Sequence, residues 1–572
     1  MIMTAEYRER GWWRDDTVLD DLRRATAAHP DRPAVVVYRT GADRASEDVE
    51  SLAYAELVEM VDRLAAGLLA LGVDRGDVVS LQMPNSWQFV ALCLACARVG
   101  AAVNPVLPIM RRREVAFMTR RTGAKVYVAP ASWNGFDYAG MLAEVRSEVP
   151  TLQHVVLLNG DGDGDGDGDG GGDGGGDGGG EALDFDAHFL QTSWGETYGP
   201  EELDKREARP DDLAQVMFTS GTTGEPKGVM HSHNTLYALT RAESESLALT
   251  GDDVISMGSP MTHQAGFAYC MLMPLLLGAT AVIQESWDPS LMLRLVQEQG
   301  VTFGMGATTF LVDAIEEQRV APRDLSSLKV FACGGSPIPP LVVERATEVL
   351  GLRVHALWGM TENGTVTITR PENPPDRAAM SDGSPVAWME ARIVDAANEP
   401  VAEGTTGRLQ VRGASQCLGY LGRPDLYEES LAPGGWFDTG DLARDDGFGG
   451  IRIAGRVKDL IVRGGEKVPV VEVEAALLRH PAVRDVAIVG YSDDRLGERA
   501  CAFIVASEPA PGLPELTAHL ADLGMAKQYW PERLELREAL PKTPSGKIQK
   551  FQLRTELADE TTDQITDQIT EG

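Results

Sequence analysis

A run of glycine and hydroxyl residues that ends in a lysine occupies Phe218 to Val229, with the sequence FTSGTTGEPKGV. Glycines allow backbone conformations that expose N–H groups, hydroxyls add neutral donors, and Lys227 adds a positive charge, so together they suit a polyphosphate. The run is not a Walker A loop, because the spacing G-x-x-x-x-G-K-[ST] is absent and Gly228 follows Lys227. We therefore predict a phosphate-binding loop of another kind. Its predicted residues are Thr219, Ser220, Gly221, Thr222, Thr223, Gly224 and Lys227.

Two further segments carry charged side chains that suit phosphate chemistry. Glu362 lies in WGMTEN, and a carboxylate is a hard oxygen ligand for Mg²⁺, which can bridge phosphate oxygens and neutralise developing charge. Lys547 lies in PKTPSGKIQK, although a lysine in a polar Pro/Gly loop is usually solvated. Each segment is weak evidence when it is taken alone.

The order of these motifs resembles that of the adenylate-forming superfamily, which includes acyl-CoA synthetases, luciferases and the adenylation domains of peptide synthetases. The resemblance covers roughly Asp20 to Leu557. Within the superfamily, MTHQAGF, CGGSPIPP and WGMTEN are most similar to cyclohexanecarboxylate-CoA ligases and short- to medium-chain fatty acyl-CoA synthetases. The resemblance implies a ligase that uses ATP, Mg²⁺ and CoA in two steps. A carboxylate and ATP give acyl-AMP and pyrophosphate, and a thiol then displaces AMP.

The resemblance also implies a nucleotide site built around WGMTEN. Trp358 would stack on adenine, Gly359 would lie beside it, and Thr361 and Glu362 would serve the α-phosphate and Mg²⁺. The loop in CGGSPIPP would border adenine and the acyl chain through glycines that permit close approach. Its predicted residues are Gly334, Gly335 and Ser336.

The C-terminal motifs resemble the ribose-binding and hinge elements of the superfamily. Asp441 of WFDTGDLA would accept hydrogen bonds from the ribose, with help from Arg456 of GRVKD, although a surface ion pair is the alternative for either residue alone. Lys458 matches the hinge about which the small domain rotates. One orientation would bring Lys547 to the attacking carboxylate, where a cation relieves the repulsion between two anions. The other would place Gly464 and Gly465 at the thiol entrance.

The acyl site is predicted from the P-x-x-H-x-x-G element in PMTHQAGF and from apolar residues near the other motifs. His263 would lie against the acyl chain, although a histidine packed in the core is the alternative. Gly364 is predicted to leave room for a bulky or alicyclic group, and the surroundings indicate an uncharged acid. The predicted acyl residues are His263, Phe267, Met305, Gly306, Ala307, Leu357 and Gly364.

Two other functions remain open at this point. The enzyme could pass its acyl group to a carrier protein or partner enzyme instead of CoA. Alternatively, the chain could bind a nucleotide or acyl-AMP without catalysis, although the charged residues of all the motifs are present.

Composition restricts the partners and the compartment. The chain has 572 residues with a formal net charge of −34, which disfavours binding to nucleic acid because polyanions are repelled. Six sparse cysteines in apolar surroundings indicate a reducing compartment, and Cys93 and Cys96 lack the other ligands of a metal site. The charged N-terminal segment lacks the apolar stretch of a signal peptide. We therefore expect a cytoplasmic enzyme.

The segments that position these motifs alternate between strand-like and helical patterns. Up to about residue 150, and again after residue 211, apolar runs such as PAVVVY and LKVFACGG alternate with amphipathic helical windows, which predicts wound sheets. Binding sites are expected where the strands end. We predict a large domain over residues 1–457 with a β-rich section after residue 382, and a small mobile α+β domain over residues 458–557.

Three segments need separate interpretation. The apolar run from Ala265 to Ile283 approaches the length of a membrane span, but Pro274 and Gly278 divide it, which favours a buried helix to Leu277 followed by a strand. The Asp/Gly run at residues 160–180 lacks the apolar and closing residues of calcium motifs, so we predict a flexible insertion. The tail at residues 558–572 is predicted to be disordered.

Overall fold

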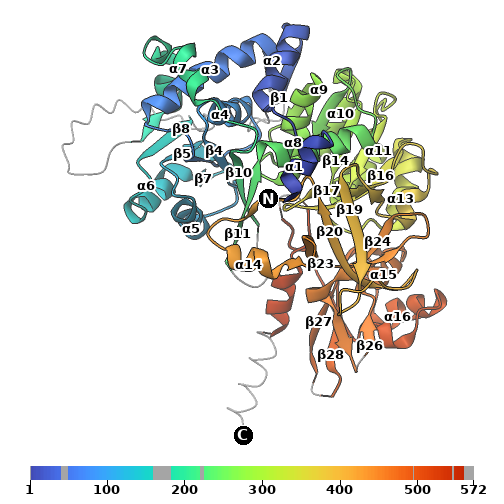
Figure 1. Cartoon of the computed structure of the whole chain (residues 1–572). Coiled ribbons are helices and arrows are strands. Elements are labelled where there is room, and N and C mark those ends of the chain that lie inside the picture. The colour runs from blue at the N-terminus through green and yellow to red at the C-terminus, as the bar shows by residue number, and fades with distance from the viewer. Residues whose placement is uncertain are drawn as a thin grey trace, which may run out of the picture.

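The computed structural model describes residues 2–39, 49–158, 182–219, 225–464, 466–493, 495–543 and 546–558. The predicted Asp/Gly insertion and residues 559–572 of the predicted tail lie outside these ranges. Two large sheets lie side by side, and a smaller C-terminal sheet lies below them (Figure 1). The predicted α/β fold, with a large N-terminal and a small C-terminal domain, is confirmed. The boundary at residue 457 stays a prediction.

The first large sheet has eight strands in the described part of the chain and is drawn mainly in blue and teal in Figure 1. Its central pairs are parallel, and the β10–β11 and β11–β21 pairs are antiparallel. In sheet order the strands are β21 (Gly419–Tyr420), β11 (Lys227–Ser232), β10 (Leu213–Thr219), β4 (Ala102–Pro105), β3 (Val78–Leu81), β5 (Val126–Pro130), β8 (His154–Leu158) and β9 (Leu183–Asp184). The hairpin of β6 (Ser132–Trp133) and β7 (Phe136–Asp137) stands apart.

The second large sheet has nine strands among the described residues and includes a strand from the N-terminal region. β1 pairs in parallel with β13, Val36 lying opposite Val282, although these residues are far apart in the sequence. The strands in order are β18 (Ser384–Pro385), β17 (Gly364–Ile368), β16 (Val354–Met360), β15 (Val330–Cys333), β14 (Phe303–Gly306), β12 (Val254–Met257), β13 (Thr280–Gln284), β1 (Pro33–Tyr38) and β2 (Val49–Ala53).

Apolar residues on both faces of the strands divide the core into layers. Val35 and Val37 of β1 face the core between the two sheets, whereas Val36 and Tyr38 face the helices outside, as the alternation of a strand requires. The helices that contribute to the shared core are α2 (Val18–Ala28), α3 (Tyr54–Ala70), α4 (Trp87–Arg98), α7 (Pro200–Arg206), α8 (His233–Ser246) and α9 (Met273–Leu277). The outer helices are α5 (Arg112–Thr122), α6 (Tyr138–Glu148), α10 (Pro289–Gln299), α11 (Thr308–Val320), α12 (Pro340–Arg345) and α13 (Arg377–Met380).

The long apolar run predicted as a buried helix and a strand has that structure. A π-helix (Gly266–Leu272) leads into α9, Gly278 ends the helix in a left-handed conformation, and β13 follows. None of the helices in the described part of the chain combines the length and apolarity that crossing a bilayer requires.

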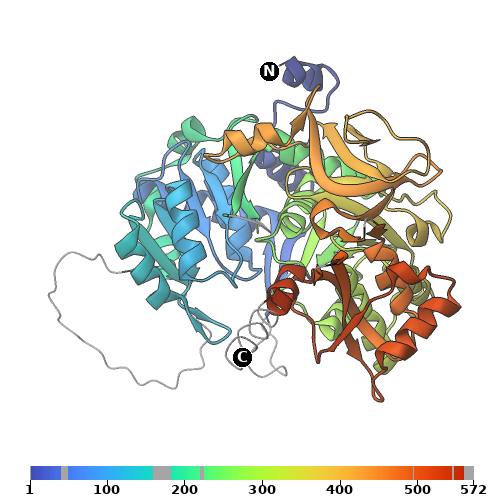
Figure 2. The same ribbon diagram turned by 90° about the horizontal axis from the view of Figure 1, so that it is seen from below.

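Two smaller sheets complete the described structure. The first contains β19 (Met389–Val394), β20 (Gly407–Gly413), β22 (Leu431–Ala432), β23 (Trp436–Asp445) and β24 (Ile451–Arg456), and α14 (Pro424–Glu429) lies beside it. The C-terminal sheet contains β25 (Ile461–Arg463), β26 (Glu466–Val468), β27 (Val483–Asp493), β28 (Gly497–Ala506) and β29 (Arg533–Leu536), with α15 (Val470–Leu477) and α16 (Leu513–Asp522). Seen from below, this orange and red part lies against the large sheets (Figure 2).

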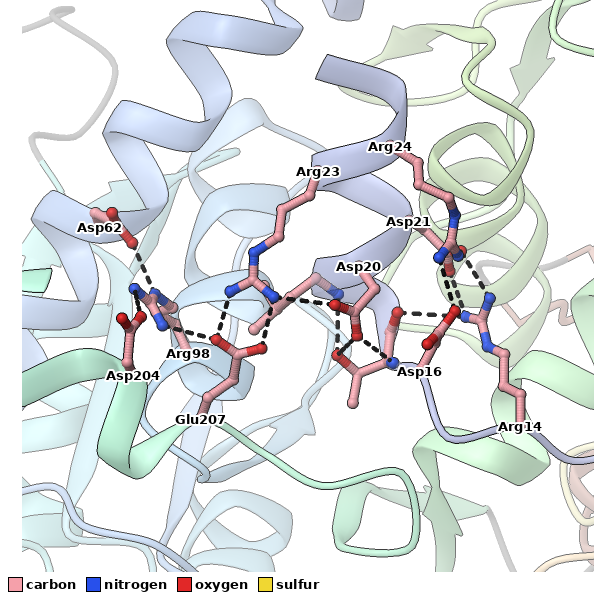
Figure 3. Close-up of polar contacts among 12 residues, drawn as sticks. Arg14, Asp16, Asp20, Asp21, Arg23, Arg24, Asp62, Arg98, Asp204 and Glu207 are labelled. Atoms are coloured by element: carbon pink, nitrogen blue, oxygen red, sulfur yellow. Dashed lines mark hydrogen bonds and ion pairs between the residues drawn. The ribbon is translucent and has the colours of Figure 1, made fainter. Parts of the chain in front are cut away.

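A buried arginine joins the helices of the N-terminal region (Figure 3). Arg98 on α4 is 6% exposed and pairs with Asp62 at 2.9 Å, Asp204 at 2.6 Å and Glu207 at 2.7 Å. Arg23 on α2 reaches the same Glu207, its Nη1 lying 2.9 Å from Oε1. Because a buried guanidinium needs partners for its fixed donors, this cluster fixes α2, α3, α4 and α7 relative to one another.

Candidate nucleotide and acyl site

The candidate site lies where parallel strands of the nine-stranded sheet end. β14 ends at Gly306, which is opposite Cys333 at the end of β15, and Cys333 is opposite Ala356 in β16. The segments predicted to bind adenine and the acyl chain follow these strands directly. Ligands bind beyond the carboxyl ends of strands in open α/β sheets, so the location agrees with the predicted one.

The predicted phosphate loop spans the turn between β10 and β11. Thr219 at the end of β10 is opposite Lys227 at the start of β11, so the hairpin brings the two ends of the loop together. The other predicted loop residues, Ser220, Gly221, Thr222, Thr223 and Gly224, lie outside the described residues.

Tyr420 joins the lysine of this loop to the predicted magnesium ligand. Lys227 Nζ lies 4.5 Å from the centroid of the Tyr420 ring, and the Tyr420 hydroxyl donates to Glu362 Oε1 at 2.9 Å. Burial raises the pKa of Glu362, while the hydrogen bond from Tyr420 and the charges of Lys227 and Arg456 oppose the rise. The site therefore holds a carboxylate close to the cation that would meet the phosphates.

The donor set around Glu362 fits Mg²⁺ that is held largely by its nucleotide. The described residues contain no cluster of three or more His, Cys, Asp or Glu side chains that could hold a metal ion alone. Mg²⁺ commonly takes one or two carboxylates and completes its shell with substrate phosphates and water. One carboxylate beside the phosphate loop is therefore a suitable protein contribution.

The turn that carries Thr361 and Glu362 is held through its backbone. His231 of β11 makes a 2.8 Å hydrogen bond from Nε2 to the carbonyl oxygen of Thr361, and the N–H of Cys417 donates to the carbonyl of Glu362 at 2.7 Å. Burial lowers the pKa of His231 to about 4, so the ring is neutral at pH 7. Its Nε2 then carries the hydrogen that the carbonyl accepts.

The predicted adenine and ribose residues contact one another. Trp358 Nε1 donates to Asp441 Oδ2 at 2.9 Å, and Arg456 Nε lies 3.1 Å from Asp441 Oδ1. Asp441 and Arg456 are opposite each other on β23 and β24, so pairing of these strands positions both. Burial raises the pKa of Asp441, and Arg456, Trp358 and Lys547 oppose the rise.

Lys547 lies inside this site, although it belongs to the C-terminal part of the chain. A Cβ built on Gly335, whose φ is +81°, would be 3.0 Å from Lys547 Cε. The loop is closed by the Lys547 N–H, which donates to Thr543 Oγ1 at 3.0 Å. Burial lowers the pKa of Lys547 to about 8, Arg456 adds to the fall, and Asp441 and Glu362 oppose it.

Of the side chains predicted to form the acyl site, His263 lies within electrostatic reach of Lys547. Burial, with a contribution from the charge of Lys547, lowers the pKa of His263 to about 4, so His263 is neutral at pH 7. Phe267 is buried and packs edge-on against Phe89, with 6.4 Å between the ring centroids. Met305 and Gly306 are buried at the end of β14, Ala307 follows them directly, and Leu357 is buried in the middle of β16.

Close backbone packing explains why glycine occupies positions 334 and 359. A Cβ on Gly334 would lie 2.7 Å from the carbonyl oxygen of Leu357, and one on Gly359 would lie 2.2 Å from that of Gly364. Ser336, which follows Gly335, donates from Oγ to Thr308 Oγ1 at 3.1 Å. Gly334 therefore allows the predicted adenine loop to lie against β16, and Ser336 joins the loop to the start of α11 (Thr308–Val320).

The room predicted beside Gly364 is filled, and this expectation was wrong. Gly364 has a φ of +63°, and its Cβ would lie 2.8 Å from Leu239 Cβ and 3.0 Å from the Tyr269 hydroxyl. The glycine therefore meets the demands of a left-handed turn and close packing. Space for a bulky acid has to come from other residues.

Comparison with known proteins identifies the family. The family description "AMP-binding enzyme" matches residues 22–421, and "AMP-binding enzyme C-terminal domain" matches residues 472–547. The chain belongs to the AMP-binding enzyme family. It is therefore an adenylate-forming ligase.

Individual relatives of this AMP-binding enzyme cover almost all of its length. A medium-chain fatty-acid–CoA ligase from Escherichia coli (strain K12) is 34% identical over 97% of this chain and 92% of its own. A salicyl-AMP ligase/salicyl-S-ArCP synthetase from Mycobacterium tuberculosis (strain ATCC 25618/H37Rv) is 33% identical over 97% of this chain and 93% of its own. The crystal structure of an anthranilate CoA ligase in complex with anthranoyl-AMP has a TM-score of 0.81 at 23% identity, covering 96% of this chain and 98% of that one, which supports the fold.

The structure of the AMP-binding enzyme also locates the predicted hinge and thiol-entrance residues. Lys458 lies in a short 3₁₀ turn (Val457–Asp459) between β24 and β25. Gly464, at φ +59°, donates its N–H to the carbonyl of Leu496 at 2.7 Å within the C-terminal sheet. Gly465 lies outside the described residues. In this arrangement Lys547 is inside the site, and the roles of Lys458, Gly464 and Gly465 stay predictions.

Sequence reasoning missed three side chains of this AMP-binding enzyme that join the motifs. Tyr420 and His231 hold Glu362 and Thr361, and Thr309 Oγ1 donates to the carbonyl of Gly546 at 3.4 Å, beside Lys547. His231 follows the phosphate loop by a few residues, which is a weak local signal. The sequence around Tyr420 and Thr309 contains no such local signal, because the residues that they bind come from distant segments.

Proposed function

We propose that this enzyme is an acyl-CoA synthetase that activates an apolar carboxylic acid as acyl-AMP and transfers the acyl group to CoA. The observation that carries the proposal is Lys547, held beside Gly335 and within electrostatic reach of Asp441 and Glu362. This lysine is distant in sequence from the other motifs. Its position fits the adenylation step of the proposed reaction.

In that step, a carboxylate oxygen of the acid attacks the α-phosphorus of ATP, and the bond to the pyrophosphate oxygen breaks. The two reactants are both anions, so a fixed cation lowers the barrier by neutralising charge as it develops. Lys547 would supply this charge, and Lys227 would bind the phosphates at the other end of the nucleotide. Mg²⁺, when bound through Glu362, would add neutralisation of phosphate oxygens.

The acid itself is proposed from the surroundings of the strand ends. Phe267, Met305 and Leu357 offer apolar surface, and a neutral His263 adds no charge to it. The similarity to a medium-chain fatty-acid–CoA ligase supports an apolar acid and CoA as the acceptor.

Pyrophosphate release tests this proposal. The full-length protein is mixed with Mg·ATP and a panel of aliphatic, alicyclic and aromatic acids, with and without CoA. We expect acid-dependent pyrophosphate release with an apolar acid and formation of its CoA thioester when CoA is added. Release without thioester formation would instead favour transfer to a carrier protein, an acceptor suggested by the name of the salicyl-AMP relative. No release with any acid would favour a protein that only binds nucleotide or acyl-AMP.

The compartment is proposed from composition alone. We propose the cytoplasm because the cysteines are sparse and lie in apolar surroundings.

A further inference from the structure

A buried carboxyl group lies behind the site and has no role in the reaction described above. Glu243 on α8 is 0% exposed. Its Oε2 accepts a hydrogen bond of 2.5 Å from the Thr365 hydroxyl, and the Thr365 N–H donates to the Tyr269 hydroxyl oxygen at 2.8 Å. Three separate elements, α8, the π-helix and β17, therefore meet at this cluster.

The cluster holds the hairpin that presents the nucleotide-site residues. β16 and β17 are antiparallel, Thr365 lies opposite Gly359, and the register shifts between Trp358 and Gly359. The turn between these strands carries Thr361 and Glu362. Because a register shift interrupts the strand ladder, an anchor at Thr365 from outside the sheet has a direct effect on where the turn lies.

Within the described part of the chain, no cation offsets a negative charge on Glu243. Burial raises the pKa of Glu243 to about 7, and hydrogen bonds with Thr365 and Tyr269 oppose the rise. Tyr269 on the π-helix is itself an acid, and burial raises its pKa far above the usual value. On α8, Arg241 pairs with Glu245. Among the described residues, β11, β17 and α9, which also pack on α8, contribute no charge to Glu243.

The second oxygen of Glu243 supports the same conclusion. Oε1 is buried and has no hydrogen-bond partner among the described residues. A carboxylate normally accepts hydrogen bonds at both oxygens, and a buried, unpaired charge is costly. The cluster therefore suits a neutral carboxylic acid better than a carboxylate.

We propose that Glu243 is a positioning residue for adenylation, which as a neutral acid holds Thr365 and thereby the turn of Thr361 and Glu362. A charge on Glu243 would be buried with Oε1 unpartnered among the described residues, so loss of the proton opens the cluster, releases Thr365 and slows adenylation. The role rests on the proposed function, because it acts on the first half-reaction. In this proposal Glu243 acts through Thr365 and not by contact with the acid or the nucleotide. Because Glu243 ionises, its effect appears as a pH dependence of the adenylation rate.

The test compares pH profiles of acid-dependent pyrophosphate–ATP exchange in the wild type, Glu243→Gln and a matched control. Glutamine keeps the size and an acceptor oxygen but does not ionise. Between pH 6 and pH 8 we expect kcat/KM to fall about tenfold in the wild type, where Glu243 and Lys547 both lose protons, and about twofold in Glu243→Gln, where only Lys547 does. Glu245→Gln, on the same helix but paired with Arg241 at the surface, is expected to follow the wild type.

Two substitutions of Thr365 test the anchor without altering a titrating group. Thr365→Val removes the hydroxyl donor and is expected to lower pyrophosphate exchange about tenfold, the equivalent of one buried hydrogen bond. Thr365→Ser retains the donor and should restore the exchange. Both should consume supplied acyl-AMP with CoA at rates within about threefold of the wild type, which excludes general misfolding.

Two outcomes would overturn the positioning role. One is a wild-type pH profile in Glu243→Gln, and the other is equal loss of both half-reactions in Thr365→Val. If Glu243→Gln does not fold, the comparison of Thr365→Val with Thr365→Ser still tests the positioning role. Absence of exchange in the wild type at every pH and with every acid would instead refute the proposed function.

Discussion

The stability of the protein should depend on pH through Glu243, and Glu243→Gln should remove that dependence. The folded-state pKa of about 7 lies above the ordinary value of 4.5. A raised pKa means that folding favours the protonated form, so this stability is complete below about pH 4.5 and is lost as the pH rises through 7. At about 1.4 kcal/mol for each pKa unit, the loss amounts to about 3 kcal/mol at pH 8.

Urea unfolding at pH 5, 6, 7 and 8, followed by circular dichroism and tryptophan fluorescence, measures this difference. Glutamine does not titrate, so the free energy of unfolding of Glu243→Gln relative to the wild type should rise by about 2 to 3 kcal/mol from pH 5 to pH 8. Other titrating groups, including Lys547, are present in both proteins and cancel. Glu245→Gln serves as the control, and its difference from the wild type should be flat.

A constant difference between Glu243→Gln and the wild type across this range would refute the reasoning. It would mean that Glu243 is already ionised in the folded protein at pH 5. Burial of the carboxyl and the absence of a cation among the described residues around it would then not control its protonation.

Four other substitutions have defined outcomes. Lys547→Ala should lower pyrophosphate exchange by about 10² to 10³, because it removes a positioned charge, while supplied acyl-AMP is still consumed with CoA; equal loss of both steps would argue against its assigned role. Gly364→Ala should destabilise the protein by about 1 to 3 kcal/mol in urea unfolding, because the new methyl group would clash with its packed neighbours; unchanged stability would contradict the tight packing. Arg98→Met should cost about 2 kcal/mol by the same measurement, because the charge-assisted hydrogen bonds from its guanidinium to three carboxylates are lost; a loss no larger than that from substituting an exposed arginine would show that the cluster does not stabilise the fold. Trp358→Phe should raise KM for ATP roughly tenfold, because the hydrogen bond to Asp441 is lost, and an unchanged KM would separate this bond from nucleotide binding.

Local structure was largely predictable because it depends on patterns within one segment. The apolar run at residues 265–283 contains a proline and a glycine at the points where the π-helix becomes α9 and where α9 ends. The strand predicted after it is β13. In the C-terminal region, alternating and helical patterns likewise correspond to β27, β28, α15 and α16.

The assignment of strands to sheets could not be predicted in the same way. Apolar runs similar to the one in β1 occur throughout the chain, and any of them could pair with its neighbours in the sequence. β1 instead pairs with β13, while β10 joins β4 in the other sheet. This choice depends on how the shared core of helices packs between the two sheets, which involves contacts between segments far apart in the sequence.

The candidate site shows the same division. The motifs located Lys227, Glu362, Asp441 and Lys547 through their resemblance to the superfamily, and the described structure brings these residues into one region. Tyr420 was missed because its sequence surroundings are ordinary. Tyr420 contributes to the site because the pairing of β21 with β11 brings the Tyr420 hydroxyl to Glu362.

The sequence by itself determined which chemical groups this enzyme has, the order in which they occur and the type of most local elements. Only the tertiary structure decided the steric contacts and the protonation states of those groups. Gly364 is enclosed by Leu239 and Tyr269, and burial controls the protonation of Lys547 and Glu243. The physical reason is that steric contact and desolvation depend on atoms nearby in space, and most of those atoms belong to residues far away in the chain.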